Sequence, residues 1–420
     1  MHPLCSLFRS NRCRIALALC TTLLGGCAFT DDTKPTLLKV AIASNENESI
    51  STTRFESERK ISQDFQEQLE TKQPGIRLHI SIYPVEQIEE ELKVQTNSGL
   101  GPDLIIANSN LSLNLLAHGL TDPVKLTQER KQLINQAALE RVKTTSGFIA
   151  GQPVSQYLQL ACFDKRKLDS APSTLKELSI ASSKNNVFGM VTDFDDLYWS
   201  LGGFGAGEAL AKSLAGEQPS VAAHQQLTEW LRWLKASSYQ QNIVFLPSQS
   251  ALRRALINGE MSWISCWSSQ LPQLREALKD HLGIAPLPSG NLGRATPITR
   301  LQVWSLGKNS SKRQREKSAK LLNFIMQPWA QKTYAFKYKT NYPVNPAAAM
   351  IIGKQLPFGF ANYNEAENAR VSRGDAIVAA IHSEPSLEDD IQSTMNELIF
   401  EGLSPEKAAT QLEAQLKAKR

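Results

Sequence analysis

Amide, hydroxyl and carboxylate side chains gather in short turns of this sequence and could form the hydrogen bonds that hold a small polar molecule. One turn contains Asn45 and Glu46, and another contains Asn108, Ser109 and Asn110. Planar amides and carboxylates suit ligands with several hydroxyl groups, because they offer donors or acceptors in one plane. The alternative is that these residues only shape the turns, since Asn and Ser are common in turns for local reasons.

A second group of candidates combines aromatic rings with charged groups. Aromatic rings can stack on the apolar faces of a polyhydroxyl ligand, a carboxylate can accept its hydrogen bonds, and an arginine can pair with a ligand oxygen or carboxylate. A packing role for Trp199 and a hinge salt bridge for Arg300 are the alternatives. The candidates are Tyr157, Asp196, Tyr198, Trp199, Trp267 and Arg300, which the family resemblance given below implies to lie at binding positions.

The common motifs of catalysis and cofactor binding are missing from the sequence. It has no Gly-x-Ser-x-Gly elbow, no His-Glu-x-x-His, no phosphate-binding loop and no Cys-x-x-Cys. The six histidines are scattered, whereas metal ligation needs several ligands to converge. Asp195 and Asp196 form a tight carboxylate pair, which suits a solvated turn or a hydrogen-bond acceptor better than acid–base catalysis. We therefore predict no enzyme activity, no cofactor and no metal site.

The apolar pattern predicts the elements that must position these residues. Residues 38–42 and 104–106 are apolar runs typical of buried strands, and residues 76–82 alternate as in a half-buried strand. Apolar residues four apart predict a helix over 61–69, and a second helix covers 85–96. This β-α-β-α-β order is typical of a parallel sheet with helices on both faces.

The two polar turns fall at matching places in this predicted sheet. Residues 45–47 follow the first strand, and residues 108–110 follow the third. Ligands of open α/β sheets bind beyond the carboxyl ends of the strands. We therefore expect both turns to meet at one binding edge.

The N-terminus has the layout of a bacterial lipoprotein signal. Three arginines precede an apolar run over 15–24, which ends in Gly25, Gly26 and Cys27. A spanning helix needs about 20 apolar residues, and this run is shorter, so cleavage with lipidation of the cysteine is favoured over a transmembrane anchor or an ordinary secretory signal. We predict a signal peptide over 1–26, a lipid on Cys27 and a polar tether over 27–36.

Removal of the signal changes what the composition implies. The three arginines that leave with it lower the formal net charge from +5 to +2, so nothing points to nucleic acid as a partner. The roughly 390 remaining residues exceed what one hydrophobic core usually supports, which predicts two lobes. Cys162 and Cys266 remain as a pair that could form a disulfide, and two buried free thiols are the alternative.

Several segments, in a fixed order, resemble one protein family. The family is the extracellular solute-binding proteins of ABC importers, specifically the large maltose-binding type. The segments that resemble it are Gly101-Pro102-Asp103 with Gly119-Leu120, the run 156–165 followed by Pro172-Ser173-Thr174, the segment 258–267 and the run 298–307. The sequence departs from the family pattern at two places. It has Ser265-Cys266-Trp267-Ser268 where the family often has Asn-Gly-Pro-Trp, and it has neutral side chains at 108–111 where the maltose binder has acidic and basic residues that bind sugar hydroxyls.

The resemblance implies an α/β fold of the periplasmic-binding-protein type, with two lobes, a mainly parallel sheet flanked by helices in each lobe, and a ligand cleft between them. It implies that 37–154 and 303–340 form the first lobe, and 158–299 and 341–420 the second. The implied function is to bind a sugar or sugar-derived solute by lobe closure and to deliver it to an ABC permease. The anchor on Cys27 would hold the protein on the periplasmic or extracellular face of the cell envelope.

Three other functions stay open on the sequence alone. A lipoprotein glycan hydrolase would need converging carboxylates at a suitable separation. A binder of a non-sugar solute, such as a peptide, would use the same cleft. A scaffold that binds protein would expose an apolar patch.

Overall fold

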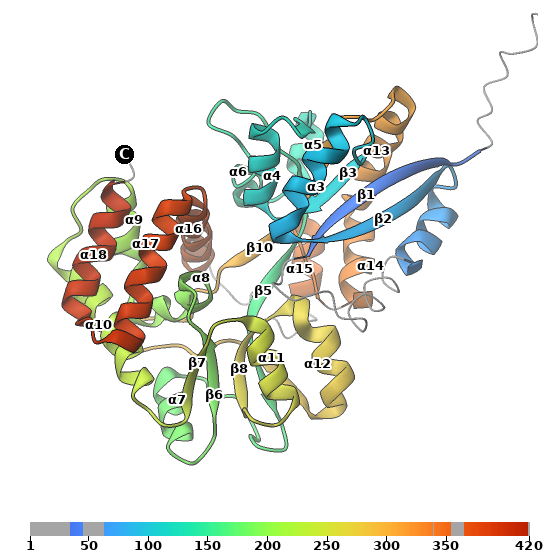
Figure 1. Cartoon of the computed structure of the whole chain (residues 1–420). Coiled ribbons are helices and arrows are strands. Elements are labelled where there is room, and N and C mark those ends of the chain that lie inside the picture. Colours follow the sequence, from blue (N-terminus) through green and yellow to red (C-terminus); the bar gives the residue numbers. More distant parts are fainter. Residues whose placement is uncertain (1–33, 45–62, 339, 354–364, 419–420) are drawn as a thin grey trace, which may run out of the picture.

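The computed structural model describes residues 34–44, 63–338, 340–353 and 365–418. It shows two α/β lobes joined by long strands that pass between them (Figure 1). One ladder of hydrogen-bonded strands runs through both lobes in the order β2-β1-β3-β10-β5-β8-β6-β7. The predicted two-lobed α/β fold is therefore confirmed.

The sheet of lobe 1 contains three parallel strands, β2 (Ile76–Pro84), β1 (Thr36–Ser44) and β3 (Leu104–Ala107). Because strand side chains alternate between faces, β1 contributes to two cores. Leu38 and Val40 pack with Leu69 on one face, and Ala41 and Ala43 pack with the helices on the other. The sheet is thus covered on both faces, as predicted.

The helices of lobe 1 include the helical residues 63–72, which together with α13 cover one face, and α3 and α4 on the other. Of the helices that the structure describes in either lobe, none has both the length and the apolar composition to cross a bilayer. The bounds are α3 (Val85–Asn97), α4 (Ser109–Ala117), α5 (Gln128–Gln132), α6 (Gln136–Glu140), α13 (Lys312–Ile325), α14 (Pro328–Tyr338) and α15 (Pro346–Gly353).

Lobe 2 has its own parallel strands, β8, β6 and β7, and a larger helical layer. Its main core joins this sheet to the C-terminal helices, because Ile391, Met395 and Leu412 lie in one cluster with Phe188. The bounds are β6 (Phe188–Val191), β7 (Ile243–Leu246), β8 (Trp263–Trp267), β9 (Leu282–Ala285), α7 (Leu175–Ser182), α8 (Phe194–Leu197), α9 (Gly207–Leu214), α10 (Val221–Ser238), α11 (Gln249–Ile257), α12 (Leu271–Leu278), α16 (Glu365–His382), α17 (Pro385–Asn396) and α18 (Pro405–Ala418).

Two long strands connect the lobes. β5 (Gln152–Asp164) pairs with β10 (Thr299–Gly307) at its lobe 1 end and with β8 at its lobe 2 end, and these pairs are antiparallel. The short β11 (Tyr342–Pro343) also pairs with β5. After it, α15 packs against α14 of lobe 1, and the division of the chain into lobes at residue 341 stays a prediction.

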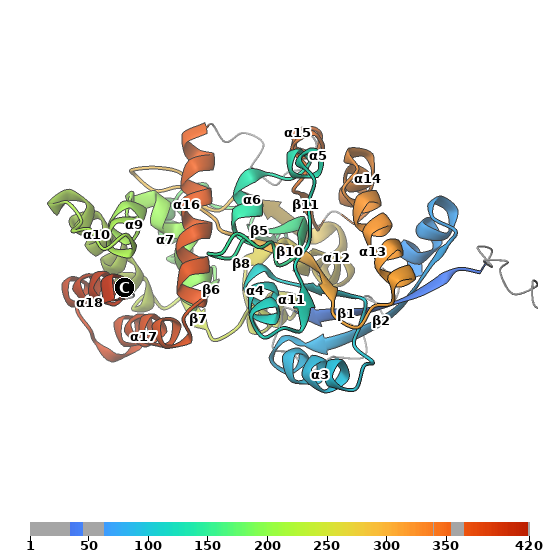
Figure 2. The same ribbon diagram turned by 90° about the horizontal axis from the view of Figure 1, so that it is seen from above.

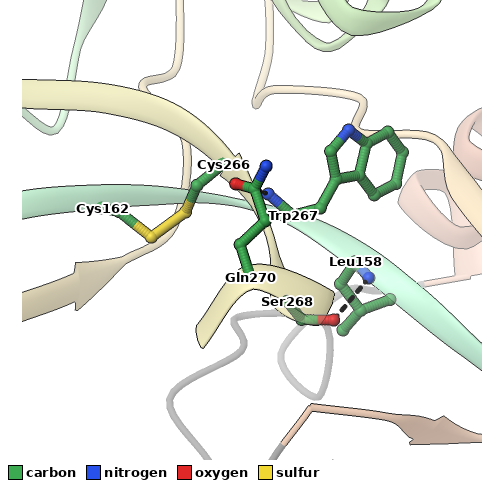
Figure 3. The surroundings of a disulfide bond; sticks show 6 residues. All are labelled: Leu158, Cys162, Cys266, Trp267, Ser268 and Gln270. Carbon is green, nitrogen blue, oxygen red and sulfur yellow. Dashed lines mark hydrogen bonds between the residues drawn. A yellow bond between two sulfur atoms is a disulfide. The ribbon is translucent and has the colours of Figure 1, made fainter. Parts of the chain in front are cut away.

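The cysteine pair left open by the sequence forms a disulfide in this structure. Cys162 on β5 is bonded to Cys266 on the neighbouring strand β8, with the two Cα atoms 5.9 Å apart (Figure 3). Close by, the backbone N–H of Leu158 donates to the Ser268 hydroxyl over 3.0 Å. These contacts hold the connecting strand β5 against the end of β8, whose last residue is Trp267.

Candidate functional site

A cavity of about 400 Å³ lies between the lobes at the carboxyl ends of β3 and β6. We call it the interlobe cavity. Both lobes and the connecting strand β10 contribute side chains to its wall, and its size suits a small-molecule site. Its polar and charged lining residues are Asn108, Ser109, Asn110, Arg141, Asp193, Asp195, Thr299, Arg300, His382, Glu388, Asp389 and Gln392.

Lobe 1 presents the start of α4 to this cavity. Asn108 is the N-cap of the helix, and its side-chain oxygen accepts a hydrogen bond from the Leu111 N–H over 2.8 Å, which satisfies one of the unpaired donors of the first turn. Ser109 and Asn110 follow and also line the cavity. The turn therefore has a local structural role and, at the same time, the position expected of a binding edge.

Lobe 2 presents three aspartates, which we call the carboxylate cluster: Asp193, Asp195 and Asp196. They follow β6 and begin α8, and one oxygen of each lies within 4.8 Å of the others. Such a group could hold a cation, but side chains already supply positive charge here. Arg300 Nη2 lies 3.0 Å from Asp195 Oδ2 and 3.8 Å from Asp196 Oδ2, and His382 Nε2 lies 3.8 Å from Asp195.

The cluster sets the charge states of its members. Burial alone would raise the pKa of Asp195, but His382 and Arg300 outweigh burial and hold it below its ordinary value. Burial opposes the charge of His382, yet its contacts with Asp195 and Glu388 raise its pKa to about 10. Burial, helped by the neighbouring aspartates, raises the pKa of Asp193 to about 7. The lobe 2 wall of the cavity thus combines the ionised carboxylate of Asp195 with two cations, Arg300 and His382. It also contains the carboxyl group of Asp193, whose pKa of about 7 lies near neutral pH.

The shift at Asp193 predicts a pH-dependent stability. Because the folded protein holds this proton more tightly than the unfolded chain, the stabilisation is complete below pH 3.8 and is lost as the pH rises through about 7. Asp193→Asn should therefore stabilise the protein at pH 8 by on the order of 2 kcal/mol and leave it unchanged at pH 3.5. Urea unfolding at both pH values measures this, with the exposed Asp169→Asn as control. A gain that is equal at both pH values would contradict the assignment.

Two of the aromatic candidates lie in the core of lobe 2, which corrects the expectation that they face a ligand. Trp199 is 0% exposed and packs against Trp263 with ring centroids 6.4 Å apart. Tyr198 is also buried, with its ring against Phe194. The short helix η1 (Tyr198–Phe204) directs both rings into the cluster of buried residues, so packing, the alternative for Trp199, describes both positions.

Trp267 lies close to the cavity but does not offer an open ring face. It is 1% exposed, and the Arg300 guanidinium covers its ring at 4.1 Å from the centroid, a favourable cation–π contact. Its Nε1 donates to Asp196 Oδ1 over 2.6 Å, and Gln249 donates to the same oxygen. Trp267 and Asp196 therefore contact Arg300 and position its guanidinium. The sequence predicted that both side chains touch the ligand directly, whereas in the structure they act on the cavity through Arg300.

The remaining candidates lie in other places. Tyr157 lines a second cavity of about 260 Å³ with Gln273 and Asn341, and it accepts a hydrogen bond from Gln302 over 3.4 Å. Asn45 and Glu46 lie outside the described residues, as do the predicted signal peptide and Cys27.

Seven polar residues of the cavity lining were not singled out from the sequence: Arg141, Asp193, Thr299, His382, Glu388, Asp389 and Gln392. Asp193 precedes the carboxylate pair, Arg141 follows a short helix, and His382 ends α16. His382 was interpreted as one of several isolated histidines, yet its Nδ1 lies 2.9 Å from Glu388. Nothing in the local sequence marks it, because its other partner, Asp195, is almost two hundred residues away.

No curated protein sequence matches this chain, whereas solved structures match almost the whole fold. The GacH receptor of Streptomyces glaucescens, solved unliganded and with acarbose, is 15% identical with a TM-score of 0.63, covering 89% of this chain and 96% of its own. MalX of Streptococcus pneumoniae with maltopentaose is 15% identical with a TM-score of 0.65, covering 91% and 100%. The maltose-binding protein MalE of Listeria monocytogenes with maltose is 17% identical with a TM-score of 0.61, covering 91% and 97%.

These likenesses establish the fold that the sequence had suggested. A family model adds the identity, because the model described as bacterial extracellular solute-binding protein matches residues 60–356. The matched segment covers well over half of the chain and includes the cavity residues from Asn108 to Arg300, whereas the cavity residues on α16 and α17 lie beyond it. The chain therefore belongs to the bacterial extracellular solute-binding protein family.

Proposed function

We propose that this protein is the lipid-anchored substrate-binding component of an ABC importer and that it binds a sugar or sugar-derived solute in the interlobe cavity. One observation carries the proposal: hydrogen-bonding side chains from both lobes, Asn110 on one side and Asp195 with Arg300 on the other, line a single cavity. A ligand that bridges the two walls binds best when the lobes approach each other, so binding favours closure.

The charges around the cavity favour an uncharged ligand. Four carboxylates line the cavity and only three cations do, so its formal charge is negative by one; the carboxylates are Asp193, Asp195, Glu388 and Asp389, and the cations are Arg141, Arg300 and His382. A ligand carboxylate or phosphate would meet this surplus and lose binding free energy. Hydroxyl groups suit the wall better, because they donate to carboxylates and accept from the Arg300 guanidinium. The cavity lining therefore favours sugars and polyols over peptides with a free carboxylate and over acidic sugars.

The proposed anchor and delivery follow from the sequence. A lipid on Cys27, followed by the tether over 27–36, would keep the receptor at the membrane surface. Tethering raises the effective concentration of the receptor at a membrane-bound permease without any new contact. The closed, loaded form would then be the state that the permease recognises.

The experiment that tests ligand binding is a calorimetric and thermal-shift screen of neutral sugars and polyols, acidic sugars and peptides. A ligand at 100 times its Kd should stabilise the protein by about 2.7 kcal/mol. Asn110→Leu should weaken the binding of the responding sugar at least tenfold, because it removes one wall's hydrogen bonds. Asn114→Leu is the matched control, since Asn114 lies on the same helix but is exposed.

Three results would contradict the proposal. A response to peptides with none to carbohydrates would favour the peptide alternative. Equal losses of affinity in the Asn110 and Asn114 variants would place the site elsewhere. Cleaved sugar after incubation, detected by chromatography, would indicate a hydrolase, since a receptor leaves the sugar unchanged.

A further inference from the structure

Arg141 reaches from lobe 1 across to the connecting strand and to lobe 2. It is the C-cap of α6, and its neighbours Leu139 and Val142 belong to a core cluster of lobe 1. Its guanidinium donates to the hydroxyl of Thr299 over 2.8 Å and to the carbonyl of Thr299 over 2.7 Å. The same group lies 3.1 Å from Asp375 Oδ2.

Asp375 completes the contact from the side of lobe 2. It lies on α16, whose residues Ile377 and Ile381 pack in the core of lobe 2, and it is buried. Its two oxygens accept hydrogen bonds from the backbone N–H and the hydroxyl of Thr299, each over 2.6 Å. Figure 2 shows α16 between the helices of lobe 2 and those of lobe 1, and α16 also contacts α4.

The position of Thr299 makes this network sensitive to lobe movement. Thr299 is the first residue of β10, opposite Leu158 on β5, where the connecting strand leaves lobe 2. Rotation of lobe 1 about the strands would move Arg141 relative to Asp375. Hydrogen bonds of this kind weaken steeply when length or angle changes, so the full set of contacts is compatible with a narrow range of lobe orientations.

We propose that Arg141, Thr299 and Asp375 form an interlobe latch that fixes the angle between the lobes and sets how often the unliganded protein departs from it. The idea rests on the lobe movement in the proposed function, but it does not depend on the ligand's identity. Interactions present in only one of two conformations shift the populations by their differential free energy. The latch would thereby tune affinity through the lobe angle, in addition to any contact that Arg141 and Thr299 make with a ligand as residues of the cavity lining.

The test measures lobe separation directly in the ligand-free protein. Spin labels on Ser98→Cys in lobe 1 and Ser183→Cys in lobe 2, both exposed positions, report the distance distribution by pulsed electron paramagnetic resonance. Arg141→Met should change the ratio of the distance populations about fivefold or more, the usual range for coupled conformational equilibria. The double variant R141M/D375N should behave in the same way and leaves no unpaired buried charge, so it guards against misfolding.

Arg315→Met is the matched control, because Arg315 also binds a carboxylate and a carbonyl, Asp122 and Gly307, but entirely within lobe 1. Its distance distribution should equal that of the parent. The proposal is wrong if the folded R141M and R141M/D375N variants keep the spin-label distance distribution of the parent, or if R315M shifts that distribution equally. Because no ligand is present, failure of the latch is separable from failure of sugar binding.

Discussion

Replacing Arg300 with methionine should lower the free energy of unfolding by roughly 3–5 kcal/mol. The variant leaves Asp195 and Asp196 buried without the guanidinium that balances them, and their side chains are only 13% and 2% exposed. It also removes the cation from the face of Trp267. Urea unfolding of the parent and variant at neutral pH measures the loss.

Arg232 provides a matched control, because it also pairs with two carboxylates, Glu229 and Glu406, but at the surface. Arg232→Met should cost less than 1 kcal/mol, as exposed ion pairs usually do. In the background of R300M, Asp196→Asn should recover part of the lost stability, since it removes one of the unbalanced charges. Equal losses for R300M and R232M would show that the carboxylate cluster does not depend on Arg300.

Reduction of the Cys162–Cys266 disulfide should lower the free energy of unfolding by about 4 kcal/mol. The bond joins residues 104 positions apart, so it removes a large loop-closure entropy from the unfolded chain. Both cysteines lie in a buried cluster, and Cys162 is on β5, the strand that links the lobes. Chemical unfolding with and without reductant measures the difference.

The double variant Cys162→Ala/Cys266→Ala is the control for this measurement, because a reductant has no disulfide of this pair to break in it. Its unfolding midpoint should be the same in both conditions. Because two cavities form in the core, the variant should be less stable than the oxidised parent. A parent protein that unfolds identically with and without reductant would show that the bond makes no contribution.

Strand and helix positions in lobe 1 followed from the sequence because their causes are local. The alternation over 76–82 and the apolar runs at 38–42 and 104–106 each became a strand of the parallel sheet. The turn at 108–110 reached the cavity for the same reason, since the carboxyl ends of parallel strands share an edge. These are properties that a short window of residues determines.

The lobe 2 wall could not be predicted in this way. Tryptophan suits both a core and a ligand platform, and only the fold directs Trp199 into the core while it places Arg300 over Trp267. The environment of Asp195 depends on Arg300 and His382, more than a hundred residues away. Long-range electrostatic partners leave no periodic signal in the sequence, so their identities come only from the structure.

The antiparallel pairing of β3 with β10 has a consequence for the order in which the chain can fold. Residues 104–107 find their partners at 303–306, about 200 residues later. As the chain emerges from the ribosome, lobe 1 cannot complete its sheet until nearly all of lobe 2's strands have been made. A product truncated before β10 would expose the edge of β3, and unpaired edges of this kind recruit other chains. Premature termination should therefore lead to aggregation rather than to a free-standing first lobe.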